Sequence, residues 1–327
     1  MKYKIIMTVD QVISNAQASL LENSEWVKRY DEYAKQILAN IPEIKINRKK
    51  FKEFSPFHFY ISTTNAKNAK STLCLDVRYR GQSVATLKTN NTDITISTKQ
   101  QDEKNLRDFS CGINLNDISW GDTKVSEFRK FFKNRVNSRN NNDKNKKNEE
   151  HNVENLLLSE FSKRKSNNKQ ITGIQPIKIG SVRFGMPTLI SASNHTTLKY
   201  PKQSGGGIDI FARTGKGRAT YLTVIEVKDE NKKSEPPKVA LKQAIQYAVF
   251  IRELLRSNCG KNWYEIFGFS GAIPKKLKLR AVCAMPDDTA DKSFEKQTYQ
   301  IGHDQIECHY IYFKYDGKQL TNFQTSL

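Results

Sequence analysis

An acidic residue and a lysine stand two positions apart at the end of a strongly hydrophobic run. Glu226 and Lys228 follow residues 221–225, which read Tyr-Leu-Thr-Val-Ile. Residues two apart on a strand point to the same face, so both charged side chains share one side of it. A run that is mostly apolar on both faces is typical of a central strand covered by helices. Charges at its end must be bound by something, so we expect a polar site there.

A second carboxylate lies upstream, directly after a glycine run. Asp209 follows the glycines at 205–207, and the segment between Asp209 and Glu226 predicts two adjacent antiparallel strands with a turn at 214–217. The two carboxylates would then be offered to one hard cation such as Mg²⁺, which prefers oxygen ligands and keeps several waters. The alternative interpretation is an ordinary surface ion pair between Glu226 and Lys228.

A helical pattern follows the second of these strands. Pro236 and Pro237 mark its start, where proline is well tolerated. Gln243 and Tyr247, four residues apart, lie on one face beside the apolar stripe. The stripe consists of Ala240, Leu241, Ala244, Ile245, Ala248, Ile251 and Leu255.

These three motifs together resemble the PD-(D/E)XK superfamily of metal-dependent nucleases. Asp209 after its glycines, the Glu226-Val227-Lys228 run and the Gln243…Tyr247 helix stand in the order of that family, and the last pair is similar to the motif of its RecB-like branch. Gly207-Ile208 replaces the proline that often precedes the aspartate. The resemblance covers about the last half of the chain. It implies an α/β fold (α+β overall), in which a restriction-endonuclease-like αβββαβ core accompanies a separate N-terminal α+β domain.

The resemblance also implies a division of labour at the site. The metal would be Mg²⁺, with Mn²⁺ as a substitute, and it would polarise a phosphate and help to generate hydroxide. Lys228 would hold or activate the attacking water, and Gln243 with Tyr247 would lie next to the substrate. The implied metal ligands are Asp209, Glu226 and the backbone carbonyl of Val227.

Residues 153–163 predict the helix that precedes the sheet. Members of the superfamily often carry on this helix a glutamate that points at the metal site. Glu154 fits this position best because apolar residues follow it at i+3, i+4 and i+7, and Glu160 is the second choice. Either residue could instead be an ordinary surface acid.

The segment 136–152 is almost without apolar residues and is rich in Asn and Lys. Such a segment cannot bury enough surface to offset its ordering entropy, so we interpret it as a flexible polar linker. A long surface loop within one domain is the alternative. The linker divides the chain into an N-terminal α+β module, residues 1–135, and a nuclease-like domain, residues 153–327.

The N-terminal module begins with helical spacing over residues 9–41, ending just before Pro42, as one long helix or two shorter ones. A last helix carrying Phe128, Phe131 and Phe132 near Trp120 is expected to dock on its sheet. The expected strands are 57–61, 73–79, 83–87 and 93–97, with a hairpin turn at 80–82.

Several basic residues could contact phosphates. Arg78 and Arg80 flank Tyr79 on a predicted strand, and a basic, aromatic sheet face can bind phosphates and stack bases. Lys216 and Arg218 in the turn before Glu226 are further candidates. The alternatives for the module are a solvated positive surface around an ordinary core and a homodimer contact.

Composition limits the class of partner and the compartment. The 327 residues carry a formal charge of +20, which favours polyanions, with nucleic acid as the first candidate and a membrane surface as a weaker one. No stretch approaches membrane-spanning length and no signal peptide is recognisable. The cysteines have no zinc or redox spacing, which predicts reduced thiols in a cytoplasmic protein. They are Cys74, Cys111, Cys259, Cys283 and Cys308.

From these observations we expect a Mg²⁺-dependent DNA endonuclease that hydrolyses phosphodiester bonds. A restriction-like or phage-defence role in a prokaryote follows from fold analogy alone. Two alternatives stay open: a nucleic-acid-binding module that has lost activity, and a nuclease acting on RNA, with DNA the favoured substrate.

Overall fold

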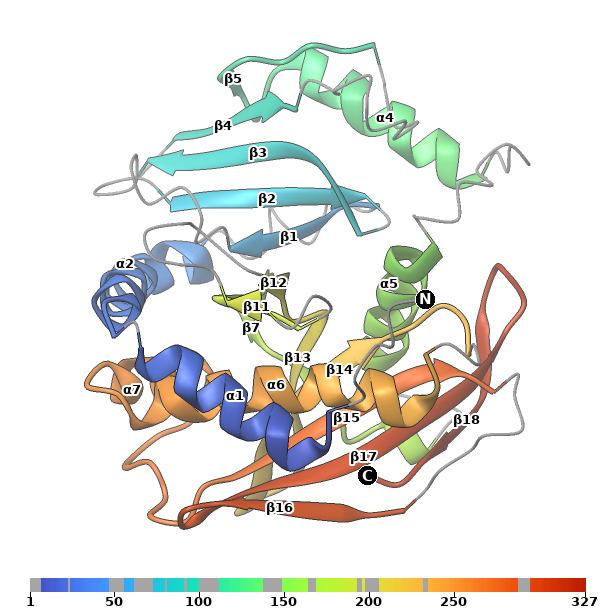
Figure 1. Cartoon of the computed structure of the whole chain (residues 1–327). Helices are drawn as coiled ribbons and strands as arrows, with labels where there is room; N and C mark the ends of the chain where they lie inside the picture. Colours follow the sequence, from blue (N-terminus) through green and yellow to red (C-terminus); the bar gives the residue numbers. More distant parts are fainter. Residues whose placement is uncertain are drawn as a thin grey trace. The chain divides into compact units, whose positions relative to one another are not determined.

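Each of two units of the chain is built around its own mixed sheet (Figure 1). The computed structural model describes residues 7–22, 24–46, 56–61, 73–79, 81–90, 93–99, 112–137, 149–163, 169–192, 196–197, 206–231, 235–287 and 295–327. Unit 1 comprises Met1–Ala34, Leu156–Ile177 and Gly185–Leu327, and unit 2 comprises Lys35–Asn155 and Lys178–Phe184. Helices and mixed sheets together make an α+β protein, as the sequence predicted.

The sheet of unit 1 has seven strands, ordered β16-β17-β15-β14-β13-β6, with β18 also paired to β17. β14 lies between β13, which is antiparallel to it, and β15, which is parallel. Residues 222–227 of β14 are all buried, as expected for a central strand. The strands are β6 (Gln175–Pro176), β13 (Ile210–Lys216), β14 (Ala219–Val227), β15 (Lys278–Pro286), β16 (Gln297–Ile301), β17 (Asp304–Tyr315) and β18 (Leu320–Thr325).

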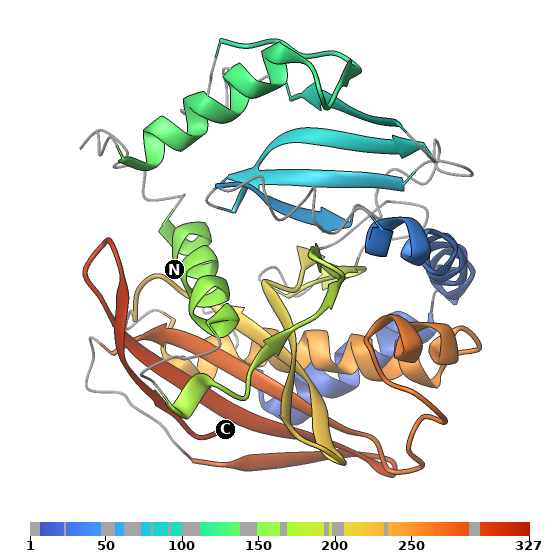
Figure 2. The ribbon, with the colours of Figure 1, turned by 180° about the vertical axis from the view of Figure 1, so that it is seen from behind.

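Two helices stack on one face of this sheet (Figures 1 and 2). α6 (Pro237–Arg256) packs against β14, β15 and β17, and α1 (Val9–Leu21) packs on α6. Pro236 is the N-cap residue of α6 and Pro237 begins it, as predicted. α1 begins with a capping box in which Thr8 and Gln11 satisfy each other's backbone N–H groups. α6 is therefore enclosed between the sheet and α1.

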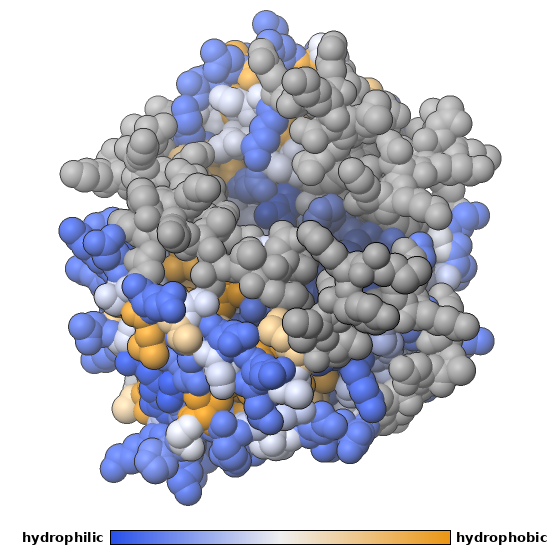
Figure 3. Space-filling model, viewed as in Figure 1, coloured by the Kyte–Doolittle hydropathy of each residue, from blue (hydrophilic) through white to orange (hydrophobic). Residues whose placement is uncertain are grey.

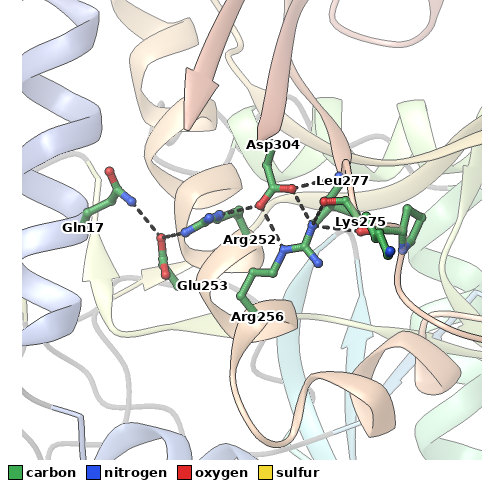
Figure 4. Close-up of polar contacts among 8 residues, drawn as sticks. Gln17, Arg252, Glu253, Arg256, Lys275, Leu277 and Asp304 are labelled. Carbon is green, nitrogen blue, oxygen red and sulfur yellow. Dashed lines mark hydrogen bonds and ion pairs between the residues drawn. The ribbon is translucent and has the colours of Figure 1, made fainter. Parts of the chain in front are cut away.

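A buried acid fixes the end of α6 to two strands (Figure 4). Asp304, only 3% exposed, accepts hydrogen bonds from Arg252 and Arg256 of α6 and from the backbone N–H of Leu277. Arg252 also pairs with Glu253, which accepts a hydrogen bond from Gln17 of α1. Charge pairs of this kind hold a structure in one register but are strongly destabilising when one partner is removed.

The N-terminal helical pattern forms two helices, α1 and α2 (Trp26–Ile46). Pro42 lies inside α2 rather than after its end, so this boundary prediction was wrong. Ile37 and Ile44, seven residues apart and both buried, continue the apolar stripe past the proline. Burial of Ile44 thus outweighs the hydrogen bond that proline removes.

The sheet of unit 2 has the order β5-β4-β3-β2-β1-β8-β7. The four strands expected from the sequence are confirmed, and α4 (Thr123–Asn137) packs on them through Phe128 and Phe132, whose rings contact Phe57. The strands are β1 (His58–Ile61), β2 (Leu73–Tyr79), β3 (Gln82–Asn90), β4 (Asp93–Thr98), β5 (Ile118–Ser119), β7 (Lys178–Ile179) and β8 (Val182–Phe184).

The two units differ from the expected domain limits at both ends. Met1–Ala34 belongs to unit 1 because α1 packs on α6, and Lys178–Phe184 belongs to unit 2 because β8 pairs in parallel with β1. α5 (Glu149–Ser162) begins in unit 2 and ends in unit 1. Of the expected linker, residues 138–148 lie outside the described residues, and its ends belong to α4 and α5. Sequential order along the chain therefore does not define the units.

Three further findings concern surface and thiols. On the face drawn in Figure 3, the described residues present mostly hydrophilic side chains with small hydrophobic areas between them. Among the described helices, none is both long and apolar enough to cross a membrane. Four cysteines are buried and free, as expected, and Cys111 lies outside the described residues; the four are Cys74, Cys259, Cys283 and Cys308.

Candidate functional site

The β13–β14 hairpin brings Asp209 beside the Glu226-Val227-Lys228 run. The ladder of the hairpin ends at the pair Ile210–Ile225, with Asp209 directly before Ile210 and Glu226 directly after Ile225. The Val227 backbone N–H donates a hydrogen bond to Asp209 Oδ2 over 2.8 Å. The predicted antiparallel pairing is confirmed. The turn lies two residues later than expected, because the ladder continues to the pair Lys216–Ala219.

Lys228 links the hairpin to α6 through a chain of short polar contacts. Its Nζ donates to Glu226 Oε1 at 2.9 Å and to Gln243 Oε1 at 3.3 Å. Gln243 Nε2 in turn donates to Glu235 Oε1 at 2.6 Å, and the same Glu235 oxygen lies 3.7 Å from Lys228 Nζ. Glu226 and Lys228 therefore share one side of the strand, as their spacing predicted.

A backbone hydrogen bond and burial both fix the position of Lys228. Although β14 ends at Val227, the Lys228 N–H still donates to the carbonyl of Ala284 in β15, over 2.9 Å. The side chain of Lys228 is 11% exposed and that of Glu226 is 7% exposed. An ion pair at this depth is weakly screened by solvent and salt, so it orients both side chains.

Glu235 is a member of this site that the sequence did not single out. Glu235 accepts a hydrogen bond from Gln243, and the nearby Asn231 is buried. Glu235 stands directly before the Pro-Pro start of α6, where the positive end of the helix dipole favours an acid. An acid directly before the Pro-Pro start of the helix is therefore the sequence feature that could have identified Glu235 as a site residue.

Tyr247 lies next to both carboxylates. Burial, together with the negative charges of Glu226 and Asp209, raises the pKa of Tyr247 well above its usual value of 10. A hydrogen bond with the Ala192 backbone and the charge of Lys228 act in the opposite direction. The hydroxyl therefore keeps its proton at any working pH and acts as a neutral hydrogen-bonding group.

The structure explains why position 206, in the 205–207 glycine run, must be a glycine. A Cβ added to Gly206 would lie 2.7 Å from the Tyr247 hydroxyl oxygen and 2.9 Å from the Ile190 carbonyl oxygen. Gly206 belongs to β12 (Gly206–Gly207), which pairs with β9 (Pro187–Thr188). Close approach of this backbone to Tyr247 thus requires a residue without a side chain.

The site is locally negative within a strongly positive chain. Asp209, Glu226 and Glu235 contribute three carboxylates against the single ammonium of Lys228, while the whole chain carries +20. The Cys283 thiol, paired with Glu226 across β14 and β15, has its pKa raised by burial and then by Glu226. This charge balance favours a bound cation.

The donor set fits a hard cation that needs few protein ligands. Two opposed carboxylates and the Val227 carbonyl offer oxygen atoms only, which suits Mg²⁺, an ion often bound by one or two carboxylates and several waters. Among the described residues no group of three or more His, Cys, Asp and Glu side chains is placed to hold a metal.

Other residues selected from the sequence lie elsewhere. Lys216 and Arg218 are exposed at the hairpin turn, and Lys216 lies about 23 Å along the strand from Asp209 at 3.3 Å per residue. Arg78, in unit 2, bonds Asp76 over 2.7 Å and lies over the Tyr60 ring. Arg80 lies outside the described residues.

The two candidate glutamates of α5 have different surroundings. Glu154 belongs to unit 2, is 4% exposed and has Oε2 3.5 Å from His151 Nδ1. Glu160 belongs to unit 1 and pairs with Lys163 in the last turn of the helix. Of the two, Glu154 is the buried one, and its place at the site stays a prediction.

Comparisons of this chain with protein-family models, with curated proteins and with solved structures found no match. The chemistry of the site therefore has to be argued from its own residues. They form one cluster within unit 1: Asp209, Glu226, Lys228, Glu235, Gln243 and Tyr247.

Proposed function

We propose that this protein is a Mg²⁺-dependent DNA endonuclease of the PD-(D/E)XK type. One observation carries the proposal: the Asp209 carboxylate accepts a hydrogen bond from the Val227 N–H, and the neighbouring Lys228 contacts both Glu226 and Gln243. Two acids and a lysine at the end of a buried strand, next to a glutamine and a tyrosine from the following helix, are the residue types that metal-assisted phosphodiester hydrolysis needs.

The order of elements in unit 1 supports the same family. α5, β6, β13, β14, α6 and β15 occur in the order helix, three strands, helix and strand. Small extra strands lie between β6 and β13, and a short helix, α7 (Gly260–Ile266), lies between α6 and β15. β6, β13 and β14 are antiparallel neighbours, and α6 connects β14 to the parallel strand β15. A restriction-endonuclease-like αβββαβ core is the arrangement that we infer from this order.

The chain's own residues have distinct tasks in such a reaction. Water adds to phosphorus, the bond from phosphorus to the leaving oxygen breaks, and that oxygen takes up a proton. Because Lys228 contacts two carboxylates, we assign it to hold the attacking water and balance phosphate charge rather than to act as a base. Tyr247, which keeps its proton, and Gln243 would orient the substrate.

Bound Mg²⁺ would supply Lewis-acid polarisation of the phosphate and a lowered pKa for its water. Asp209, Glu226 and the Val227 carbonyl are the atoms that would hold it. The negative charge of this cluster repels a phosphate, so a bound cation would favour the approach of the scissile phosphate to these carboxylates. The +20 charge of the whole chain supports attraction of the polyanion from a distance.

The test is cleavage of supercoiled plasmid, linear duplex, single-stranded DNA and RNA by purified protein, with Mg²⁺ and with EDTA. Asp209→Asn and Glu226→Gln should abolish cleavage, and calorimetric titration should show that Mg²⁺ binding is lost, because each substitution removes a carboxylate charge. Each new amide still offers an oxygen that can accept the existing hydrogen bond, so the local structure is kept. Glu295→Gln is the matched control, since Glu295 is an exposed acid of the same unit.

Opening of supercoiled plasmid would identify an endonuclease, and degradation from ends alone an exonuclease. If the protein preferred RNA, the proposed substrate would be RNA instead of DNA, and the proposed active site would be unchanged. Nucleic-acid binding without Mg²⁺-dependent cleavage would identify an inactive binding module and overturn the proposed activity.

A further inference from the structure

A pocket of about 510 Å³ opens at the other end of the β13–β14 hairpin, within unit 1. Tyr221, one of its lining residues, is five residues from Glu226 on β14, about 16 Å at 3.3 Å per residue. The pocket is therefore separate from the carboxylate site. Its volume falls in the range of small-molecule sites, which are about 300–1,000 Å³.

The described residues that line the pocket include four cations and no Asp or Glu. Arg218, in the hairpin turn, and Lys276, in the loop before β15, are exposed at its rim. Lys278 pairs with Glu307 at 2.9 Å, so part of its charge is already balanced. The remaining cations make the pocket electropositive, in contrast to the carboxylate site on the same strands.

Arg213 is held in the pocket wall by a glycine. Its Nη1 donates to the Gly268 carbonyl over 3.0 Å, and a Cβ added to Gly268 would lie 2.6 Å from the same nitrogen. Gly268 has φ +84°, a conformation that glycine adopts readily. Arg213 Nε is buried, so an oxyanion in the pocket would meet the terminal Nη groups of Arg213. A guanidinium fixed in this way is suited to bind an oxyanion.

Aromatic rings complete the lining beside these cations. Tyr264 and Phe269 stack with ring centroids 4.7 Å apart and an angle of 14° between planes. Phe269 is half-buried and Tyr264 is buried, so the outer ring of the stack is Phe269. A nucleobase can extend such a stack, because every base has a π face.

We propose that this pocket holds one nucleotide of an unpaired strand, with its base on Phe269 and its phosphates near Arg213, Arg218 and Lys276. The inference rests on the proposed function in that nucleic acid is the substrate, and it adds a second contact point whose Tyr221 lies about 16 Å along β14 from Glu226. A base inside a duplex is stacked on its neighbours and not available to Phe269, so the pocket favours single-stranded segments or ends.

The test is fluorescence anisotropy of a labelled ten-nucleotide oligo(dT) in EDTA, compared with an abasic strand of equal length and a ten-base-pair duplex. The wild-type protein should bind the base-bearing strand about five-fold or more tightly than the abasic one. Phe269→Leu keeps an apolar side chain but removes the ring, and it should abolish this preference. The duplex should bind with equal affinity to both proteins.

Salt dependence tests the cations. Arg218→Ala and Lys276→Ala should each reduce the slope of log K against log salt by about 0.7 on the single strand. Lys318→Ala is the matched control, because Lys318 is an exposed lysine of unit 1 outside the pocket. Thermal melting verifies that each variant is folded.

Separate outcomes decide the two proposals. If Phe269→Leu keeps the preference for bases, or if Arg218→Ala, Lys276→Ala and Lys318→Ala change the slope equally, the pocket assignment is wrong. If these effects are present but no Mg²⁺-dependent cleavage occurs, the pocket stands and the nuclease proposal falls. If Mg²⁺-dependent cleavage occurs but the pocket variants do not change the binding of single strands, the nuclease proposal stands and the pocket assignment is wrong.

Discussion

The Asp209 carboxylate accepts a hydrogen bond from the backbone N–H of Val227, with 2.8 Å between the two heavy atoms. Val227 lies between Glu226 and Lys228, so this one bond fixes the acid of the first strand beside the charged pair of the second. It also separates two properties of Asp209. Asparagine at this position can still accept the bond but carries no charge, whereas alanine loses both.

The first prediction distinguishes the lysine from the acids. Lys228→Ala should lose cleavage by roughly two to four powers of ten, as for a group acting on the transferred proton or water, but should still bind Mg²⁺. In EDTA, Asp209→Asn should bind DNA more tightly than the wild type, because a repelling carboxylate is gone. Lys228→Ala should bind it slightly less tightly. Calorimetry with Mg²⁺ and anisotropy with DNA measure the two effects, and equal behaviour of the variants would contradict the assigned roles.

The second prediction compares two buried glutamines of α6. Gln243 bridges Lys228 and Glu235, whereas Gln246 Oε1 is buried without a partner among the described residues. Gln243→Leu should lower the free energy of unfolding of unit 1 by about 1–3 kcal/mol, because Lys228 and Glu235 lose a bond. Gln246→Leu should be near neutral or stabilising.

A fluorescence signal that comes from unit 1 alone allows the unfolding free energies of the two variants to be compared for that unit. The chain has three tryptophans, of which Trp26 and Trp263 belong to unit 1 and Trp120 to unit 2. Denaturation in urea, followed by tryptophan emission in a Trp120→Phe background, therefore reports on unit 1. Equal losses for the two glutamine variants would show that the Gln243 bridge contributes nothing specific.

The third prediction concerns the contact between Gly206 and Tyr247. Gly206→Ala should destabilise unit 1 and reduce cleavage, because the new methyl group would lie 2.7 Å from the Tyr247 oxygen. Adding Tyr247→Phe should recover part of the loss, although the Ile190 carbonyl still lies close. A double-mutant cycle measures this coupling, and strict additivity would mean that Tyr247 is not in contact with Gly206.

The fourth prediction is a pH dependence at Asp304. Burial alone would raise the pKa of Asp304, but hydrogen bonds from Arg256, the Leu277 N–H and Arg252 hold it below its ordinary value of 3.8. The stabilisation is thus complete above pH 3.8 and is lost as the pH falls through the lowered value. Asp304→Asn should lose about 3 kcal/mol at pH 7.

Urea denaturation from pH 2 to pH 7 measures this dependence. The difference between wild type and Asp304→Asn should be constant at neutral pH and shrink below about pH 4. A difference independent of pH over the whole range would assign the effect to packing rather than to charge.

The sequence by itself determined which strands would form and which side chains they would carry. Alternation and turn residues predicted β1 to β4 of unit 2 but not β5, β7 and β8, and the apolar run 221–225 predicted that β14 is central. The two-residue period of a strand also placed Glu226 and Lys228 on one side. These are local properties, since they depend on residues a few positions apart.

Only the tertiary structure decided what these side chains contact. The inclusion of Glu235 in the site, the approach of Gly206 to Tyr247, and the joining of α1 with the C-terminal part of the chain depend on residues far apart in sequence. Pro42 lies inside α2 for the same reason, because burial of Ile44 outweighs the local preference. Local patterns specify a strand and its faces, but packing between distant segments selects each side chain's partners.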